Sequence, residues 1–245
     1  MRDRGERFRV RLGALALKTL KRVMPDPVRP TLRRAIEEAD VALQQLDSVR
    51  RASRLDPAGP LRLNLGCGSK PRPGWVNVDL RPGADLHLDV RRPLPFPDAS
   101  CAEIYAEHVL EHLAYPGEVE QVLADWFRVL ASGGTVSLGV PDTEWPLRAY
   151  VSGDDGYFAW CRTQPWHRDW VRTRLDTINY HFRQQSPTFG EAHLYAYDFE
   201  TLEHRLHAAG FTRVDRAAYN SSRDPKLGQD RDVHAPYSLY IEATK

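Results

Sequence analysis

The amino-acid sequence predicts an α/β fold with a mostly parallel sheet and helices on both of its faces. Short apolar runs with a strand pattern alternate with amphipathic helical patterns from residue 61 onward, as expected when helices connect parallel strands. The first run ends at Gly66 and the second at Asp79, which places a glycine turn and a carboxylate at one edge of the sheet. The 245 residues, 42% of them hydrophobic, suffice for one main core with an appendage.

Seven segments carry the strand pattern. They cover residues 61–66, 75–80, 84–90, 101–106, 135–140, 211–219 and 237–244. The last two are joined by a loop without a helix, so we expect them to be antiparallel. A strong amphipathic helix is predicted over 116–134, where Gly133 and Gly134 would end it. Asp198 is placed to cap another helix, which ends at Gly210.

Residues 1–60 form a basic N-terminal extension. They contain 12 Arg and 2 Lys against 8 Asp and Glu, a net charge of +6, so the remaining residues carry −5. Amphipathic helices are expected over 8–24 and 31–55, and DPAGP at 56–60 is expected to link them to the main domain, residues 61–245. The apolar stripe of the second helix consists of Leu32, Ile36, Ala39, Leu43 and Leu46. Three roles stay open: packing on the chain's own domain, peripheral membrane binding, and self-association or recruitment of a partner.

Composition limits the compartment and the partners. Cys67, Cys101 and Cys161 are odd in number and far apart, which argues against a disulfide framework and for a reducing, cytoplasmic location. The formal net charge of +1 gives no electrostatic case for nucleic acid. No apolar run reaches the length of about 18 residues that a spanning helix needs, and the N-terminus lacks the apolar core of a signal peptide.

The segment LNLGCGSKPRPGWVNVDL carries the strongest functional signal. Gly66 and Gly68 let the backbone turn sharply and approach a ligand closely. Asp79 is placed to accept both hydroxyls of a ribose, and Asp89 to meet an adenine amino group. A dinucleotide-binding loop has a third glycine where this chain has Pro71, so a nicotinamide-dependent oxidoreductase is the weaker alternative. A nucleoside cofactor without phosphates, such as S-adenosylmethionine, needs only the first turn.

These motifs carry a resemblance to a known family. LNLGCG, the aspartate of NVDL, LPFPDAS and YAEHVLEHL, followed by a helix ending in GG and a strand ending in VPD, resemble class I S-adenosylmethionine-dependent methyltransferases. They look most like small predicted bacterial methyltransferases of the type-11 kind. The resemblance covers about residues 61–142 and resumes weakly near the C-terminus. It implies a Rossmann-like sheet of seven strands whose last strand is antiparallel.

The resemblance also implies a cofactor site. Gly66 and Gly68 would face the methionine part, Asp79 the ribose and Asp89 the adenine. The residues expected around the cofactor are Asn64, Leu65, Gly66, Cys67, Gly68, Asp79, Leu80, Asp89, Val90 and Glu107. The family usually has an aspartate two residues after the serine of LPFPDAS, where this chain has Ala102, which puts one loop contact in doubt.

The motif H-V-L-E-H contains His108, Glu111 and His112. Read alone, it matches a zinc-peptidase signature, because the three side chains would share one face of a helix. Its position after the fourth expected strand disfavours a peptidase. Some ubiquinone-pathway and small-RNA methyltransferases carry the similar E-x-x-E-H, which holds a divalent metal, and His181 or His193 would then add a ligand. The alternative is that these side chains bond to the cofactor loop and line the pocket wall.

A methyl acceptor with a hydroxyl benefits from a base that takes its proton. The candidate catalytic residues are His108, His112, Asp142 and His193, with His181 as a further base. Residues 142–197 lack a strand pattern and are expected to form a helical lid over the substrate. This segment contains Trp145, Trp160, Trp166 and Trp170, many Tyr, and Arg162, Arg168, Arg172, Arg174 and Arg183.

The composition of this expected lid bears on the acceptor. Aromatic faces with polar tips suit sugars, and arginines suit phosphate or carboxylate groups. The aromatics can equally form the core of the lid itself, and the negative net charge of the main domain argues against single-stranded nucleic acid. We therefore expect O-methylation of a sugar, a glycolipid or another small metabolite. The alternative outside enzymes is a cofactor-binding protein that recruits a partner or a membrane.

Overall fold

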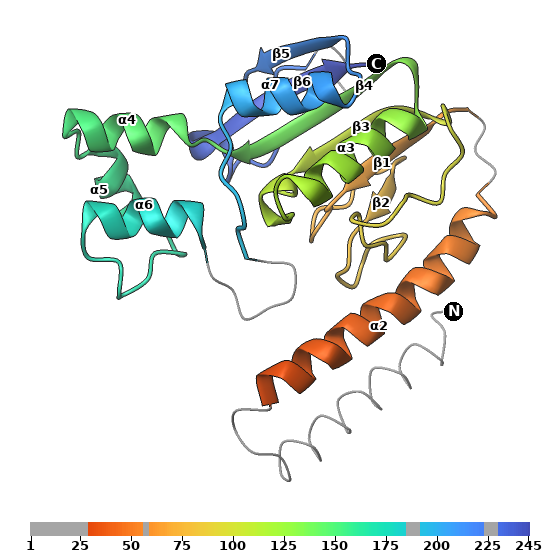
Figure 1. Ribbon diagram of the computed structural model, residues 1–245, viewed down its shortest axis with the longest axis horizontal. Helices are drawn as coiled ribbons and strands as arrows, with labels where there is room; N and C mark the ends of the chain where they lie inside the picture. Colours follow the sequence, from red (N-terminus) through yellow and green to blue (C-terminus); the bar gives the residue numbers. More distant parts are fainter. Residues whose placement is uncertain (1–28, 56–58, 185–191, 223–229) are drawn as a thin grey trace.

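The computed structural model describes residues 29–55, 59–184, 192–222 and 230–245. Six strands form one mixed sheet in the order β2-β1-β3-β4-β6-β5 (Figure 1). Their bounds are β1 Leu61–Leu65, β2 Val76–Val78, β3 Cys101–Glu107, β4 Leu130–Pro141, β5 Arg213–Ala217 and β6 Ser238–Thr244. β1 to β4 run parallel to one another, while β6 is antiparallel to both β4 and β5. The expected antiparallel pair at the C-terminus is confirmed.

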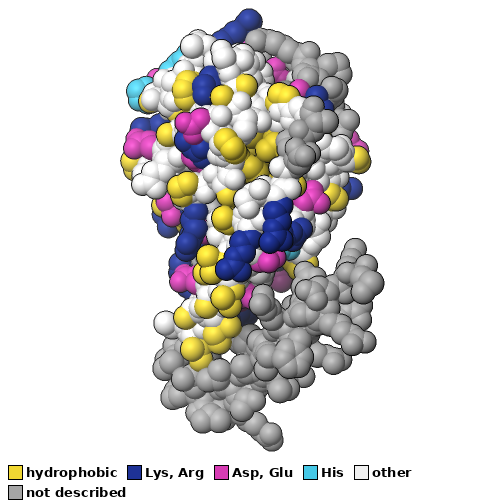
Figure 2. All heavy atoms as spheres, turned by 90° about the vertical axis from the view of Figure 1, so that its right-hand side faces the viewer, with side chains coloured by type: hydrophobic (Ala, Val, Ile, Leu, Met, Phe, Trp, Pro, Cys, Tyr) yellow, Lys and Arg dark blue, Asp and Glu magenta, His cyan; other side chains and the backbone are white. Residues whose placement is uncertain are grey.

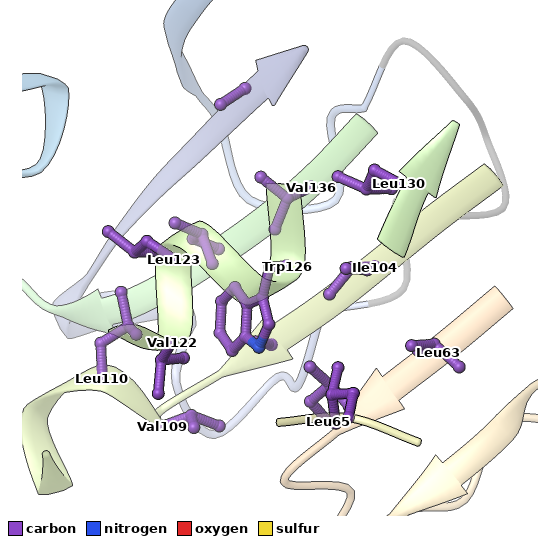
Figure 3. Close-up of a cluster of buried hydrophobic side chains, with 14 of the residues drawn as sticks. Leu63, Leu65, Ile104, Val109, Leu110, Val122, Leu123, Trp126, Leu130 and Val136 are labelled. Carbon is purple, nitrogen blue, oxygen red and sulfur yellow. The ribbon is translucent and has the colours of Figure 1, made fainter. Parts of the chain in front are cut away.

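Two helices cover one face of this sheet. α3 (Gly117–Val129) and α7 (Phe199–Ala208) lie side by side in front of the strands in Figure 1. Trp126 of α3 is fully buried, and Figure 3 shows its ring between the helix and the strand residues Ile104 and Leu65. Burying an aromatic side chain of this size contributes about 3 kcal/mol, so this face forms the main core. Asp198 caps α7 through Thr201, as expected, since its carboxylate accepts the Thr201 amide at 2.9 Å.

Irregular segments cover described parts of the opposite face. The ring of Tyr105, on β3, carries the guanidinium of Arg72 over it at 3.5 Å, and its hydroxyl donates to Asp230 at 3.0 Å. Neither partner belongs to a helix. Among the described residues, the expectation of helices on both faces is therefore met on one face only.

The third expected strand, 84–90, is a correction. This segment contributes a single bridge, between Val78 and Leu86, and no strand of its own. α2 (Arg29–Ala52) supplies the reason, because two of its side chains take up backbone amides of the segment. Ser48 Oγ accepts from His87 at 2.8 Å, and Gln45 Oε1 accepts from Asp89 at 2.6 Å. The described sheet thus has six strands rather than seven.

The end of α3 is a second correction. The helix ends at Val129, and Gly133 and Gly134 lie inside β4 instead of terminating the helix. β3 and β4 change register there, since Cys101 pairs with Leu130 while Glu103 pairs with Thr135. Gly133 has a φ of +76°, which a side chain rarely permits, so the glycine serves an irregularity in the strand.

The described parts of residues 142–197, which are 142–184 and 192–197, contain three short helices that extend to one side of the sheet in Figure 1: α4 (Glu144–Ser152), α5 (Gly156–Arg162) and α6 (Arg174–Phe182). Their aromatic side chains mainly pack on one another. Tyr157 and Phe158 are buried in a cluster of their own, separate from the main core. The expected helices are present, and many of the aromatics form the core of this segment.

The N-terminal extension is described only from residue 29. The helix expected over 8–24 lies outside the described residues. α2 buries Gln45, Ser48 and Ala52, while Leu43 and Leu46 of the expected apolar stripe are each 59% exposed. Figure 2 shows Lys and Arg side chains interspersed with apolar ones on the face of the molecule that turns to the right in Figure 1. Within the described ranges, no helix combines the length and hydrophobicity needed to cross a bilayer.

Candidate active site

The glycine loop follows β1 at the carboxyl edge of the sheet. Gly66 has a φ of +68°, and a Cβ there would lie 2.4 Å from Cγ2 of Val109. The amides of Gly66 and Cys67 both donate to the carbonyl of Val78, at 2.8 and 3.1 Å. The chain therefore needs glycine at position 66, for backbone conformation and for space.

Asp79 joins this loop to the end of β2. Its Oδ2 accepts from the amide of Gly68 at 2.7 Å, and its Oδ1 accepts from the amide of Arg81 at 2.8 Å. These two bonds fix the carboxylate at the edge of the loop. The nucleoside-binding geometry expected from sequence requires this proximity between glycine loop and carboxylate.

Asp89 lies farther along the same edge. Burial raises the pKa of its carboxyl group, but hydrogen bonds from Arg91 outweigh burial and hold the pKa below its usual range. Arg91 binds both oxygens, with Nε 2.9 Å from Oδ1 and Nη2 2.7 Å from Oδ2. The carboxylate is thus ionised and fixed in orientation.

A cavity of about 300 Å³ connects these groups. It lies where the order of strands reverses between β1 and β3, the usual ligand position in an open α/β sheet. Seven of the residues expected around the cofactor line it: Gly66, Gly68, Asp79, Leu80, Asp89, Val90 and Glu107. Asn64, Leu65 and Cys67 are buried behind the loop, where the Asn64 side chain bonds to Asn77 at 2.9 Å.

His108 lies at one end of the cavity in a constrained conformation. It is a non-glycine residue with a φ of +56°, which is uncommon and costs about 1 kcal/mol or more. Its Nε2 lies 2.8 Å from Oγ of Ser238, and its Nδ1 lies 3.1 Å from Oε1 of Glu111. The imidazole also stacks on His234, with 3.9 Å between ring centroids. The ring is thus held on both nitrogens at the cavity wall.

The carboxylate of Glu111 contacts the ring of His108, and the residue is only 1% exposed to solvent. Burial raises its pKa, but the neighbouring histidines, His108 first, lower it to about 2. Its Oε2 accepts no hydrogen bond from a described residue, whereas its Oε1 faces Nδ1 of His108 at 3.1 Å. Residues 110–112 form a single 3-10 turn, not an α-helix, so the helical face of a zinc peptidase is absent from this part of the chain.

Two more histidines surround this carboxylate. His112 Nε2 lies 3.9 Å from Oε1 of Glu111, and one ligand atom each of Glu111, His112 and His193 lie within 4.8 Å of one another. Nδ1 of His112 lies 3.1 Å from the carbonyl oxygen of Ala192, and Nδ1 of His193 lies 3.3 Å from that of His181. A carbonyl only accepts, so Nδ1 carries a proton in both rings, and a neutral imidazole of this tautomer has its lone pair on Nε2.

Of the candidate catalytic residues, His108 and His112 line the cavity, whereas Asp142 and His193 do not. Asp142 follows β4, and its Oδ1 accepts from the amide of Glu144 at 2.9 Å; burial raises the pKa of its carboxyl group. His181 bonds to Thr143, and burial lowers its pKa to about 3, so it is neutral. Asp142, His181 and His193 therefore belong to the segment 142–197 and not to the cavity wall.

Sequence analysis missed several residues of the cavity wall. Arg81, Leu88, Arg91, Val109, Leu113, Arg231 and His234 also line it. Arg231 and His234 come from the segment before β6, far from the glycine loop in sequence. Glu107, 2% exposed, meets both, with Arg231 Nε at 3.3 Å and His234 Nδ1 at 3.2 Å. No motif marks these two residues, although both lie near the end of a loop that precedes an expected strand.

Residues 75–138 match the model of a family described as a methyltransferase domain. This segment contains β2, β3, α3 and most of β4, together with Asp79, Asp89 and the H-V-L-E-H motif. No curated protein sequence gives a significant match to the chain.

Several solved structures are similar in fold. A methyltransferase dependent on S-adenosylmethionine from Archaeoglobus fulgidus is 15% identical, with 82% of this chain and 94% of that chain covered and a TM-score of 0.45. A putative methyltransferase of the same dependence from Listeria monocytogenes is 19% identical, covers 83% and 97%, and has a TM-score of 0.43. A further one from Methanosarcina mazei is 15% identical, covers 79% and 96%, and has a TM-score of 0.45. At such identities and scores, the likeness carries no functional argument.

The matched segment and the sheet agree with the resemblance found in the sequence. The family implies a final antiparallel strand, and β6 is antiparallel to β4. The glycine loop, Asp79 and Asp89 lie around one cavity at the carboxyl edge. The oxidoreductase alternative finds no such support. Residues 75–138 thus match a methyltransferase domain, within a sheet that has the final antiparallel strand expected of class I S-adenosylmethionine-dependent methyltransferases.

Proposed function

We propose that the enzyme transfers the methyl group of S-adenosylmethionine to a hydroxyl of a sugar, a glycolipid or another small polar metabolite. One observation carries the choice of an oxygen acceptor: His108 is fixed at the cavity wall with Glu111 behind it and a hydroxyl in front of it. The arrangement is that of a base oriented by a carboxylate.

The cofactor lies along the cavity in this proposal. Asp79 binds the ribose hydroxyls, and Asp89, with Leu80 and Val90 beside it, meets the adenine. Gly66 and Gly68 face the methionine part, while Asn64, Leu65 and Cys67 support the loop from behind. The cavity of about 300 Å³ and the fixed carboxylates support this orientation.

Methyl transfer from a sulfonium is an in-line displacement, and the donor is already activated by its charge. The protein mainly holds the acceptor oxygen and the methyl group in line and excludes water. His108 takes the proton of the acceptor hydroxyl. Its Nε2 already meets a hydroxyl, that of Ser238, at 2.8 Å, so an acceptor that replaces this contact is suitably placed. Glu111 stabilises the imidazolium that forms.

A divalent cation is a second element of the proposal. Glu111, His112 and His193 fit such an ion, because Oε2 of the buried carboxylate accepts no hydrogen bond from a described residue and an imidazole with its proton on Nδ1 offers Nε2 as a ligand. Of the predicted ligands His108, Glu111 and His112, His108 is replaced by His193 in this cluster. A bound cation polarises an acceptor hydroxyl and lowers its pKa.

The metal content of the purified enzyme tests this element. Mass spectrometry after dialysis against a zinc, manganese or magnesium salt is expected to find about one ion per chain. Glu111→Gln removes the charge and is expected to abolish retention, whereas Glu200→Gln, on the exposed start of α7, retains the ion. Equal metal content in both variants contradicts the cluster as the binding site.

The two flanking segments have proposed roles as well. Residues 142–197 act as a substrate lid, supported by the contact between Trp160 of α5 and Tyr237, 5.4 Å apart, since Tyr237 in turn lies 5.5 Å from His108. Residues 1–60 act as an extension of the methyltransferase domain at 61–245. The exposed Leu43 and Leu46 on α2, with the net charge of +6 over residues 1–60, support peripheral membrane binding or self-association. Sedimentation with anionic vesicles and the oligomeric state of a chain lacking residues 1–28 separate these two roles.

Transfer of a labelled methyl group from S-adenosylmethionine tests the reaction. The enzyme is incubated with panels of sugars, glycolipids, phenols and amines, and the product is identified by mass spectrometry. Transfer to a hydroxyl that His108→Gln abolishes, with cofactor binding retained, is the expected result. Transfer to nitrogen or carbon only contradicts the oxygen acceptor. Binding of the cofactor without transfer to any acceptor favours the alternative of a non-catalytic cofactor-binding protein.

A further inference from the structure

Arg231 brings a positive charge to one end of the cavity. Its Nη2 donates to the carbonyl of Cys67 at 2.8 Å and lies 3.4 Å from that of Gly66. The guanidinium lies so close to the loop that a Cβ added to Gly68 would be 3.3 Å from Nη2. Its Nε lies 3.3 Å from Oε2 of Glu107. A cation and an anion therefore stand side by side next to the glycine turn.

The other arginines of the cavity lie toward the nucleoside end. Arg91 is bound by both oxygens of Asp89, and Arg81 lies two residues after Asp79, whose Oδ1 accepts its backbone amide. Among the described residues that line the cavity, Arg231 is the guanidinium at the glycine loop. The methionine part of the cofactor is a zwitterion whose carboxylate needs a cationic partner at this end.

We propose that Arg231 binds the α-carboxylate of the methionine part, while Glu107 accepts from its α-ammonium group; this rests on the cofactor orientation proposed above. The free protein pairs Arg231 with Glu107, and the zwitterion inserts one charge opposite each. When the zwitterion replaces the Arg231–Glu107 contact, each side chain gains a new partner of opposite charge. A ligand with only one of the two charged groups would separate the pair and leave one side chain without such a partner. Guanidinium and carboxylate form paired, charge-assisted hydrogen bonds, and these give affinity and direction.

Binding of two ligands tests this assignment. S-adenosylhomocysteine carries the amino-acid part, whereas 5′-methylthioadenosine has the same nucleoside and sulfur without it. In calorimetric titration, Arg231→Met is expected to weaken S-adenosylhomocysteine about tenfold to a hundredfold and to leave 5′-methylthioadenosine within about twofold. Arg231→Lys keeps the charge and is expected to recover part of the loss. The matched control, Lys70→Met on the exposed side of the loop, changes neither affinity.

The outcomes separate this inference from the proposed function. Unchanged or tighter binding of S-adenosylhomocysteine to Arg231→Met overturns the inference. Tighter binding would mean that the guanidinium occupies part of the cofactor site and competes with the cofactor. Equal weakening of both ligands also overturns it, since that pattern reports a structural role. If the wild-type enzyme binds neither ligand, the proposed cofactor orientation fails and the inference fails with it.

Discussion

The side-chain oxygen of Gln45 accepts a hydrogen bond from the backbone amide of Asp89 at 2.6 Å. Ser48, one turn farther along α2, accepts from His87 at 2.8 Å in the same way. Residues 87 and 89 alternate along an extended segment, so the helix satisfies amides that a neighbouring strand would otherwise pair. The N-terminal extension thereby contacts the backbone of the residue whose carboxylate we place at the adenine.

Removing the acceptor at position 45 is expected to destabilise the protein. Gln45→Met keeps the size of a 6% exposed side chain but leaves the amide of Asp89 without a partner, at a cost of about 1–3 kcal/mol. Urea unfolding measures the change. Gln44→Met is the matched control, because Gln44 bonds to Asp40 in an exposed pair, and its effect is expected within about 0.5 kcal/mol. Equal effects of the two substitutions contradict the role of Gln45.

Gly66→Ala is expected to cost stability by two separable routes. The new Cβ would lie 2.4 Å from Cγ2 of Val109, and the φ of +68° disfavours any side chain. Overpacking of this kind costs about 1–3 kcal/mol. The double variant Gly66→Ala with Val109→Ala removes the clash and keeps the backbone strain.

A double-mutant cycle in urea unfolding measures the two routes. The combined loss is expected to be smaller than the sum of the single losses by at least about 0.5 kcal/mol. Additive losses would show that Gly66 does not approach Val109 as the structure has it. A double variant as stable as Val109→Ala alone would mean that the positive φ carries no cost.

The buried thiol of Cys101 makes stability depend on pH in the alkaline range. Burial raises its pKa from 9.0 to about 11. Between these values the thiol ionises in the unfolded chain but not in the folded one. The contribution of the neutral thiol is therefore complete below about pH 9 and is lost as pH rises, by about 1.4 kcal/mol for each pH unit.

Comparison with Cys101→Ala isolates this thiol from the tyrosines and lysines that titrate in the same range. The variant lacks the thiol, so its stability deficit relative to the wild type is expected to shrink as pH rises from about 9 to about 11. Guanidinium unfolding at several pH values measures the deficit. A deficit that stays constant over this range contradicts a raised pKa at Cys101.

The parts of the fold that depend on local pattern were predictable. Short apolar runs indicated all six described strands to within about five residues, and Asp198 marked the start of α7. Segment 84–90 shows the same pattern and yet forms no strand, because Gln45 and Ser48 take its amides. Contacts between segments about 40 residues apart produce no pattern in the local sequence from which they could be predicted.

The candidate site divides in the same way. The glycine loop and Asp79 follow from strand ends and turn chemistry, which the chain carries locally. Arg231 contacts the loop across more than 160 residues of sequence, and its proposed role depends on its contacts with Cys67 and Glu107 in the folded chain. Apolar spacing on α2 marked Leu43 and Leu46 but left their role open, and the residues that the helix buries in the structure, Gln45 and Ser48 among them, are largely polar.

Calorimetric titration with S-adenosylhomocysteine, with NADH as the control ligand, tests the central claim most directly. We expect micromolar binding of S-adenosylhomocysteine and none of NADH. Asp79→Ala is expected to weaken this binding at least about tenfold, because it removes the ribose acceptor and the anchor of Gly68, whereas Asp47→Ala on the exposed side of α2 has no effect. Absence of binding, or binding of NADH alone, would contradict a cofactor site for S-adenosylmethionine in this cavity.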